Sequence, residues 1–297
     1  MPTLRDIKRR ISSVKSTQQI TRAMKLVAAA KLRRAQERIE HARPYASTMA
    51  GVLGDLTRQR EGMTHPLLTH PEERAARRLL VVISGDRGLC GAFNSNIVRR
   101  SLELLRASHA EQVALALVVV GRKVRDFYRR RAGQAEIRAE HVNILERLTY
   151  AQAAGIAQGL MQPYLDGEVD EVVLLYTEFR SMASQRVVVE RLLPLEPPRA
   201  GEGDAEEAEE YLFEPSPEAV LERLLPRHVE VQVFRALLES IAAEYGARMT
   251  AMENATRNAA EMIELLTVQF NKARQERITK ELLEIVGGAE ALRHASE

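Results

Sequence analysis

The chain has 297 residues, room for one large domain or two modest ones, and its net charge of +2 gives no overall reason to expect a nucleic-acid or membrane partner. The single cysteine, Cys90, excludes an intramolecular disulfide and fits a reducing compartment. No apolar run reaches the roughly 18–20 residues of a membrane-spanning helix, and the first residues lack the apolar stretch of a signal peptide.

The first predicted element is a long helix that begins at Thr3, a residue suited to cap a helix N-terminus. Neither glycine nor proline follows before Pro44, which predicts some forty residues of helix, about 60 Å at 1.5 Å per residue. The apolar stripe has heptad-like spacing and is predicted to change phase at residues 15–19: Leu4, Ile7, Ile11 and Val14, then Ile20, Met24, Val27 and Leu32. A helix with so thin a stripe needs a partner.

The same segment is strongly basic, with eleven Lys and Arg against three Asp and Glu between residues 4 and 40. The compensating acidic residues lie far away, in segment 202–210. A local basic arm on a balanced chain favours an acidic protein or a nucleic acid as its partner, unless the arm is simply a solvated helix face. It carries no interleaved aromatic residues and no motif that reads nucleic acid, which favours acidic protein loops.

The middle of the chain has short β-branched runs that alternate with helical stretches. The predicted strands are 79–84, 113–121, 171–179 and 186–192, and the predicted helices are 92–107, 122–131 and 149–165. Strands that alternate with helices indicate a Rossmann-like α/β domain with a mostly parallel sheet. An acidic, proline-containing loop that ends near residue 210 leads out of it.

A second long helix is predicted from Pro226 to Gly287, where Gly246 is the only helix-weakening residue. Its apolar seam follows three- and four-residue steps: Leu238, Ile241, Tyr245, Met252, Ala255, Ala259, Met262, Leu266 and Ala273. Antiparallel pairing of the two helices into a coiled-coil shaft would leave about 25 Å of the longer one unpaired. The alternative is two unrelated core helices of a globular domain. The predicted division is an N-terminal shaft helix (1–58), a linker (59–78), an α/β domain (79–215) and a C-terminal shaft helix (216–297).

One segment has the position of a ligand site, Ser84-Gly-Asp-Arg-Gly-Leu-Cys-Gly91, because it follows a strand and precedes a helix. Its glycines do not match the dinucleotide fingerprint, and it lacks the lysine of a phosphate-binding loop. We therefore interpret these glycines as residues of tight turns that let the strand pack against the following helix. Cys90 near a helix N-terminus can have a lowered pKa, but no partner base or second thiol accompanies it. The histidines have no metal-ligand spacing. We therefore expect no catalytic residue, no cofactor and no metal.

Four motifs in order resemble the γ subunits of F-type ATP synthases of the bacterial type. They are Thr3–Val14 with Gln19–Lys31, Asp86-Arg-Gly-Leu-Cys-Gly91, Tyr211-Leu-Phe-Glu-Pro215, and Asn271–Ala291, in which Ile278, Thr279, Glu281, Glu284, Gly288 and Ala289 have the family spacing. The similarity covers nearly the whole chain and is weakest at 57–71 and near Asp204. The cysteine-bearing insertion of the chloroplast relatives is missing.

This resemblance implies a non-catalytic central rotor that regulates ATPase activity and proton flow. Its partners would be three α and three β subunits, the ε subunit and the c-ring, with membrane association only through the complex, on the cytoplasmic face. The family positions that contact β match Met24, Lys25, Arg274, Gln275 and Thr279, and those of the foot, near ε or the c-ring, match Tyr211 and Glu214. Two other functions stay open from the residues alone: a coiled-coil adaptor for acidic partners and a nucleotide-dependent α/β enzyme.

Overall fold

The computed structural model describes residues 3–59, 65–68, 76–131, 133, 135–182, 184–196, 214 and 216–294. Two long helices, α1 (Leu4–Gln59) and α5 (Pro217–His294), enclose the other elements in the chain order. Contacts within the chain define two units. We call Ala28–Arg248 the α/β unit, and Met1–Val27 together with Met249–Glu297 the helical unit.

The α/β unit is built on a five-stranded sheet in the order β3-β2-β1-β4-β5. The strands are β1 (Arg77–Ile83), β2 (Ala114–Val120), β3 (Glu136–His141), β4 (Glu171–Phe179) and β5 (Gln185–Leu193). The first four are parallel and β5 runs antiparallel to β4. The central strand β1 is buried from Leu79 to Ile83 because helices cover both faces of the sheet, as its continuous apolar run predicts.

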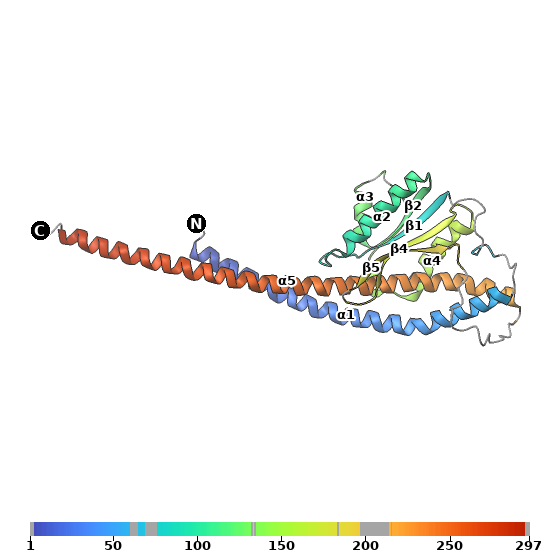
Figure 1. Ribbon diagram of the computed structural model, residues 1–297, viewed down its shortest axis with the longest axis horizontal. Coiled ribbons are helices and arrows are strands. Elements are labelled where there is room, and N and C mark those ends of the chain that lie inside the picture. The colour runs from blue at the N-terminus through green and yellow to red at the C-terminus, as the bar shows by residue number, and fades with distance from the viewer. Residues whose placement is uncertain are drawn as a thin grey trace. The chain divides into compact units, whose positions relative to one another are not determined.

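Helices α2 (Phe93–Ala110) and α3 (Arg122–Arg129) cover one face of the sheet, and α4 (Tyr150–Leu165) lies on the other with α5 and α1 (Figure 1). The apolar core on the second face is the larger, since it joins strand residues such as Val81 and Leu174 to Leu53 of α1 and Leu237 of α5. Thr149 caps α4 with its side chain, and Gln152 bonds back to the Thr149 backbone, a reciprocal pair that fixes where the helix begins. A one-turn 3-10 helix, η1 (Leu145–Arg147), precedes α4.

The predicted Rossmann-like α/β class with terminal helices is confirmed. Strand β3 was missed because its sequence, Glu-Ile-Arg-Ala-Glu-His, is mostly polar and only partly buried at the sheet edge. The predicted four-segment division into domains stays a prediction.

Both long helices pass through a proline at which the uninterrupted helical pattern stops, although the predicted shaft segments 1–58 and 216–297 already extend past it. Helix α1 continues beyond Pro44, and α5 begins before Pro226. A proline inside a helix costs about 3 kcal/mol, whereas full burial of one Leu or Met side chain stabilises by about 1.5–3 kcal/mol. Several such residues are buried close to each proline: Met49, Leu53 and Leu56 after Pro44, and Leu221, Leu225 and Val229 around Pro226. Packing therefore outweighs the local signal.

In the helical unit the two helices pair antiparallel, with Thr21 beside Thr256 and Lys25 beside Glu253. The predicted change of phase at residues 15–19 is wrong, because Gln18 and Thr21 continue the inward face while Ile20 and Val27 are 59% and 57% exposed. The Thr21 and Thr256 hydroxyls bond to each other at 2.7 Å, so polar residues are tolerated in the seam. Met262, predicted in the seam, is 49% exposed, whereas Met252, Ala259 and Leu266 are buried.

Among the described residues, no helix has both the length and the hydropathy to span a membrane. In the same part of the chain, no three His, Cys, Asp or Glu side chains are grouped so that they could hold a metal ion.

Candidate functional site

The turn between β1 and α2 has the position of a phosphate site but is occupied by the chain's own groups. Asp86 accepts hydrogen bonds from the backbone N–H groups of Arg122, 2.9 Å away, and Asn143, 3.1 Å away. The Arg122 N–H belongs to the N-terminus of α3, where an anion would otherwise bind. Gly85 donates its N–H to the Asn94 side chain at 2.9 Å. Three donors near the turn are therefore already used, and the Asp86 carboxylate takes the place of an anion at the N-terminus of α3.

Helix α5 closes the same turn from the other side. A Cβ atom on Gly85 would lie 2.9 Å from the Glu244 carboxyl group, so a larger residue here would require that carboxyl group to move. Arg248 donates to Glu244 at 2.6 Å and to the Gly88 carbonyl at 3.2 Å. Burial raises the pKa of Glu244, and the Arg248 charge opposes this rise. A second carboxyl group in the turn is a further obstacle to a phosphate anion.

Cys90 lies in this turn with 2% of its surface exposed. The start of α2 could lower the pKa of the thiol, but burial raises it. The Asn94 amide donates to Sγ at 3.0 Å. A buried thiol with a raised pKa is a poor nucleophile, which agrees with the expectation of no catalytic cysteine.

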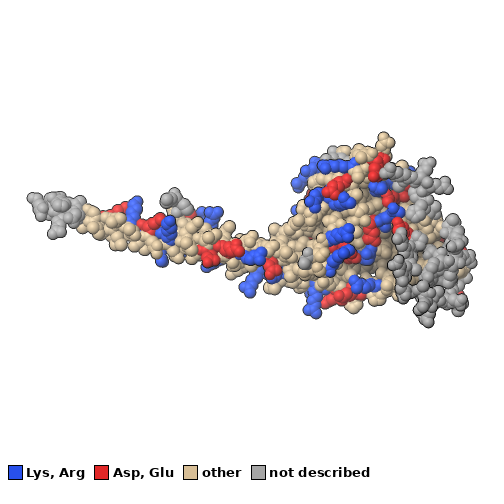
Figure 2. Space-filling view, viewed as in Figure 1, with Lys and Arg blue, Asp and Glu red and all other residues tan. Residues whose placement is uncertain are grey.

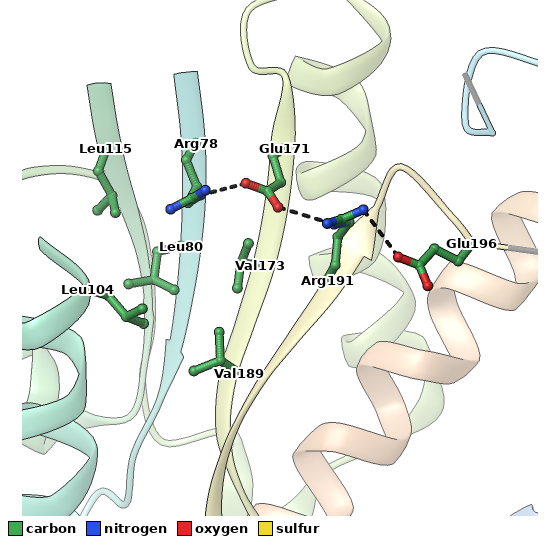
Figure 3. A pocket seen from close by; sticks show the side chains of 9 residues that line it. All are labelled: Arg78, Leu80, Leu104, Leu115, Glu171, Val173, Val189, Arg191 and Glu196. Carbon is green, nitrogen blue, oxygen red and sulfur yellow. Dashed lines mark hydrogen bonds and ion pairs between the residues drawn. The ribbon is translucent and has the colours of Figure 1, made fainter. Parts of the chain in front are cut away.

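A hollow of about 340 Å³ lies where β1 and β4 begin (Figure 3). Its walls include Leu80, Leu104, Leu115, Val173 and Val189. Four charged side chains form one continuous chain along it: Arg78 to Glu171 at 2.6 Å, Glu171 to Arg191 at 3.2 Å, and Arg191 to Glu196 at 3.2 Å. The charges balance and each has a partner. The hollow also lies at the amino ends of the strands, opposite the edge at which α/β sheets bind their ligands.

Met24 and Lys25 lie on α1 in the helical unit. Lys25 forms an ion pair with Glu253 of α5 at 2.7 Å, and this hydrogen bond lowers the pKa of Glu253. Met24 is half-buried in the helix pair. Both side chains therefore contribute to helix pairing and keep only part of their surface for a partner.

Arg274, Gln275 and Thr279 are all exposed on α5. Their first member lies 21 residues beyond Glu253, about 30 Å along the helix, so these residues and the Met24–Lys25 pair are two separate surfaces. The pairing register of the helical unit places Leu4 opposite Ala273. Every residue from 274 to 289 is exposed, because α1 has no residue to cover it. We call this segment, residues 274–289, the tip.

The tip is also unusually apolar for an exposed helix. Its exposed aliphatic residues are Ile278, Leu282, Leu283, Ile285 and Val286, each between 48% and 68% exposed. Two more, Leu265 and Val268, lie before the tip at 66% and 63% and were not predicted as contact residues. The sequence signal for them was their absence from the three- and four-residue seam. An exposed apolar helix of this extent indicates a surface that a partner covers.

Of the two predicted foot residues, Glu214 is exposed. Tyr211 lies outside the described residues.

Comparison with known proteins agrees with a shaft and a small α/β domain. The family model described as ATP synthase matches residues 3–292. A protein of Pelotomaculum thermopropionicum called ATP synthase gamma chain is 50% identical over 292 residues, which cover 98% of this chain and all of that protein.

Two solved structures have the same fold. A chain in the central stalk and c-ring structure of the Tetrahymena thermophila mitochondrial ATP synthase has a TM-score of 0.58 and 29% identity, over 80% of this chain and 99% of that one. A chain of the Euglena gracilis mitochondrial ATP synthase has a TM-score of 0.70 and 24% identity, over 99% and 96% of the two chains.

Proposed function

Because the chain belongs to the ATP synthase gamma-chain family, we propose that it is the central rotor subunit of an F-type ATP synthase. The observation that carries this proposal is the 50% identity to a gamma chain over the full length of both proteins. The subunit is non-catalytic and couples rotation of the c-ring to ATP synthesis or hydrolysis on other subunits. An adaptor and a nucleotide-dependent enzyme are the weaker explanations, since neither accounts for similarity from one end of the chain to the other.

The partners of the rotor are the α, β and ε subunits and the c-ring. A shaft changes the affinity of a β subunit only if it contacts the subunit's states unequally. Inverting a population from 1:99 to 99:1 takes about 5.5 kcal/mol of differential contact. The exposed aliphatic side chains of the tip suit a surface that turns within an apolar sleeve, because dispersion contacts are not directional.

Contacts with β are proposed for five residues: Met24, Lys25, Arg274, Gln275 and Thr279. Arg274 offers a planar donor fork that suits a carboxylate, and Gln275 adds a donor and an acceptor. Support for these two comes from their exposure on a helix that has no cover of its own. Tyr211 and Glu214 are proposed to contact ε or the c-ring at the foot.

The protein is a peripheral part of a membrane complex. We propose that it lies on the cytoplasmic face of the cell membrane, where bacterial relatives would expose their catalytic subunits to cytoplasmic ATP.

Reconstitution tests the proposed function directly. The full-length chain is mixed with the α and β subunits of the same organism, and the product is separated by size and assayed for stoichiometry and steady-state ATPase. We expect one copy of this chain per three α and three β subunits, with ATPase that depends on its presence. An adaptor would leave α and β unassembled.

Calorimetric titration of the isolated chain with ATP separates the rotor from the enzyme. The Gly85 N–H of the turn bonds to Asn94, the Asp86 carboxylate occupies the N-terminus of α3, and the turn at 84–91 has no lysine, so we expect neither tight binding nor hydrolysis. Micromolar binding would revive the nucleotide-dependent enzyme.

A further inference from the structure

The two helices that cover one face of the sheet, α2 and α3, form a second basic region of this nearly neutral chain, in addition to the basic segment 4–40 of α1. Residues 93–131 hold nine Lys and Arg against three Asp and Glu, a net charge of +6, whereas the whole chain carries only +2. The rest of the chain therefore sums to −4. In Figure 2 blue side chains gather over the part of the α/β unit where Figure 1 draws α2 and α3.

Helix α3 has two faces of opposite character. Its inner face carries Val124 and Tyr128, both buried, and the Tyr128 hydroxyl bonds to Ser101 of α2 at 2.6 Å. Its outer face carries Lys123, Phe127, Arg130 and Arg131, which have the i, i+4, i+7, i+8 spacing of one helical face. Arg130 is the C-cap residue of α3 and has αR backbone angles, so the helical path of the backbone extends to it. We call these four residues the α3 outer face.

The cations of α3 differ in whether they form a direct ion pair, although Arg122 and Arg130 also act at longer range on Asp126 and help to lower the pKa of its carboxyl group. Arg125 pairs with Asp126 at 2.6 Å, and Arg129 pairs with Glu140 of β3 at 2.6 Å. Among the described residues, no carboxylate lies within ion-pair distance of four others, namely Arg122, Lys123, Arg130 and Arg131. Three of these four lie on the α3 outer face.

An aromatic side chain lies among these charges. The Arg131 guanidinium lies 4.1 Å from the Phe127 ring centroid, and Phe127 meets Tyr128 edge-on at 5.2 Å. Phe127 is only half-buried. A cation stacked on a partly exposed ring offers a partner both charge and apolar contact.

We propose that the α3 outer face binds an acidic segment of a partner protein, one in which Asp and Glu alternate with apolar side chains. This goes beyond the rotor function, since the α3 outer face contains none of the predicted contact residues. Arginine forks match carboxylate geometry, and the same helix already demonstrates this fit where Arg129 bonds both Glu140 oxygens, at 2.8 and 2.6 Å.

The structure favours a protein segment over the other polyanions. Helix α3 has eight residues, about 12 Å of helix, which matches a short peptide better than a bilayer surface. Single-stranded nucleic acid binds through several stacked aromatic rings, whereas this face presents one.

The test measures peptide binding to the full-length chain by fluorescence anisotropy. The probe is a labelled peptide of Glu-Glu-Leu repeats, with the Gln-for-Glu peptide as its uncharged counterpart. The test variant is Lys123→Glu with Arg130→Glu, because both side chains are exposed and neither forms a direct ion pair with a described residue. The matched control is Arg99→Glu with Arg106→Glu on α2, which changes the net charge by the same amount through two exposed residues.

We expect the Glu-containing peptide to bind the wild-type chain and the control, and the test variant to bind it about tenfold more weakly. Equal loss of binding in the test variant and the control would overturn the proposal, since only net charge would matter. So would wild-type binding of the uncharged peptide. Binding of phosphatidylglycerol vesicles and of a single-stranded oligonucleotide is measured in parallel. If either binds more tightly than the Glu-containing peptide, and the test variant weakens that binding, the α3 outer face belongs to that other class of partner. Assembly with α and β is measured separately, so a failed rotor function is recognised independently of the peptide result.

Discussion

The α/β unit and the helical unit use their apolar residues in opposite ways. In the α/β unit, side chains such as Leu80, Val119 and Leu175 are completely buried, and strands from distant parts of the chain share one core. In the helical unit the buried residues form one thin seam, and the tip leaves its aliphatic side chains exposed. A region with few internal contacts has little stability of its own and depends on what it binds. Internal stability is therefore concentrated in the α/β unit, and exposed aliphatic surface in the helical unit.

The largest expected effect comes from a substitution in the α/β unit, at Gly121, where the backbone closely approaches that of Ser84. Gly121 has φ of 96°, and a Cβ atom there would overlap the Ser84 carbonyl oxygen. We expect Gly121→Ala to cost about 4 kcal/mol or more in free energy of unfolding, measured by urea denaturation. The matched control is Gly133→Ala, where φ is 100° but nothing lies within 4 Å of the added Cβ, and its cost should be about 1–2 kcal/mol. Equal costs would show that conformation alone, not the close approach, decides.

The same substitution made in both units compares them directly. Leu80 is fully buried and Leu283 is 67% exposed. We expect Leu80→Ala to lower the free energy of unfolding by about 2–5 kcal/mol and Leu283→Ala by less than about 0.5 kcal/mol. Chemical denaturation of the isolated chain gives both values. A large loss from Leu283→Ala would mean that the tip is packed in the free protein, which contradicts the comparison.

A third prediction concerns a substitution that should change the ATPase rate without affecting assembly of the complex. Arg274→Ala with Gln275→Ala should leave the complex with α and β assembled but change its ATPase rate about tenfold, since a charge-assisted contact is worth about 1.5–3 kcal/mol. The control is Lys272→Ala with Glu276→Ala, two exposed residues of the same helical turns outside the proposed contacts. Wild-type turnover in a fully assembled double mutant would eliminate the contact and leave Arg274 and Gln275 as solvated residues.

The smallest expected effect is on the pH dependence of stability, which we compare for one carboxyl group from each unit. Burial raises the pKa of Glu244 above 4.5, so the folded state takes up a proton before the unfolded state does. Its contribution to stability therefore increases as pH falls through the folded pKa toward about 4.5. Glu253 is the opposite case, because its hydrogen bond to Lys25 lowers its pKa and the stability it contributes is lost as pH falls below 4.5.

The melting temperatures of the wild type, Glu244→Gln and Glu253→Gln are measured across this acidic pH range. The change with pH in the difference between each variant and the wild type gives the contribution of that carboxyl group. The two differences should have opposite signs. A shared sign would mean that burial and pairing do not separate the two units in this way.

The contact surfaces were predictable from the sequence to different degrees. Exposure of Arg274, Gln275 and Thr279 follows from the unequal lengths of the two helices, which are visible in the sequence. The ion pair of Lys25 with Glu253 was not predictable, because the pairing register of two helices more than 200 residues apart is set by packing. The α3 outer face was not predicted, because the six Lys and Arg of residues 122–131 indicated only a helix and not which of them share its exposed face.

By itself the sequence determined the elements whose signal is local and repeated. Two long helices follow from a period near 3.6 without interruption, and the central strands from β-branched apolar runs. It also determined the absence of a phosphate-binding lysine in the turn at 84–91. Only the tertiary structure showed which buried side chains keep α1 and α5 helical through Pro44 and Pro226, that polar β3 joins the sheet, and that Gln18 and Thr21 face inward. Each of these depends on groups distant in the chain: buried leucines that offset a proline, backbone bonds from β2, and a threonine hydroxyl on the opposite helix. A local sequence pattern cannot predict a contact with a residue that is distant in the chain and becomes a neighbour only on folding.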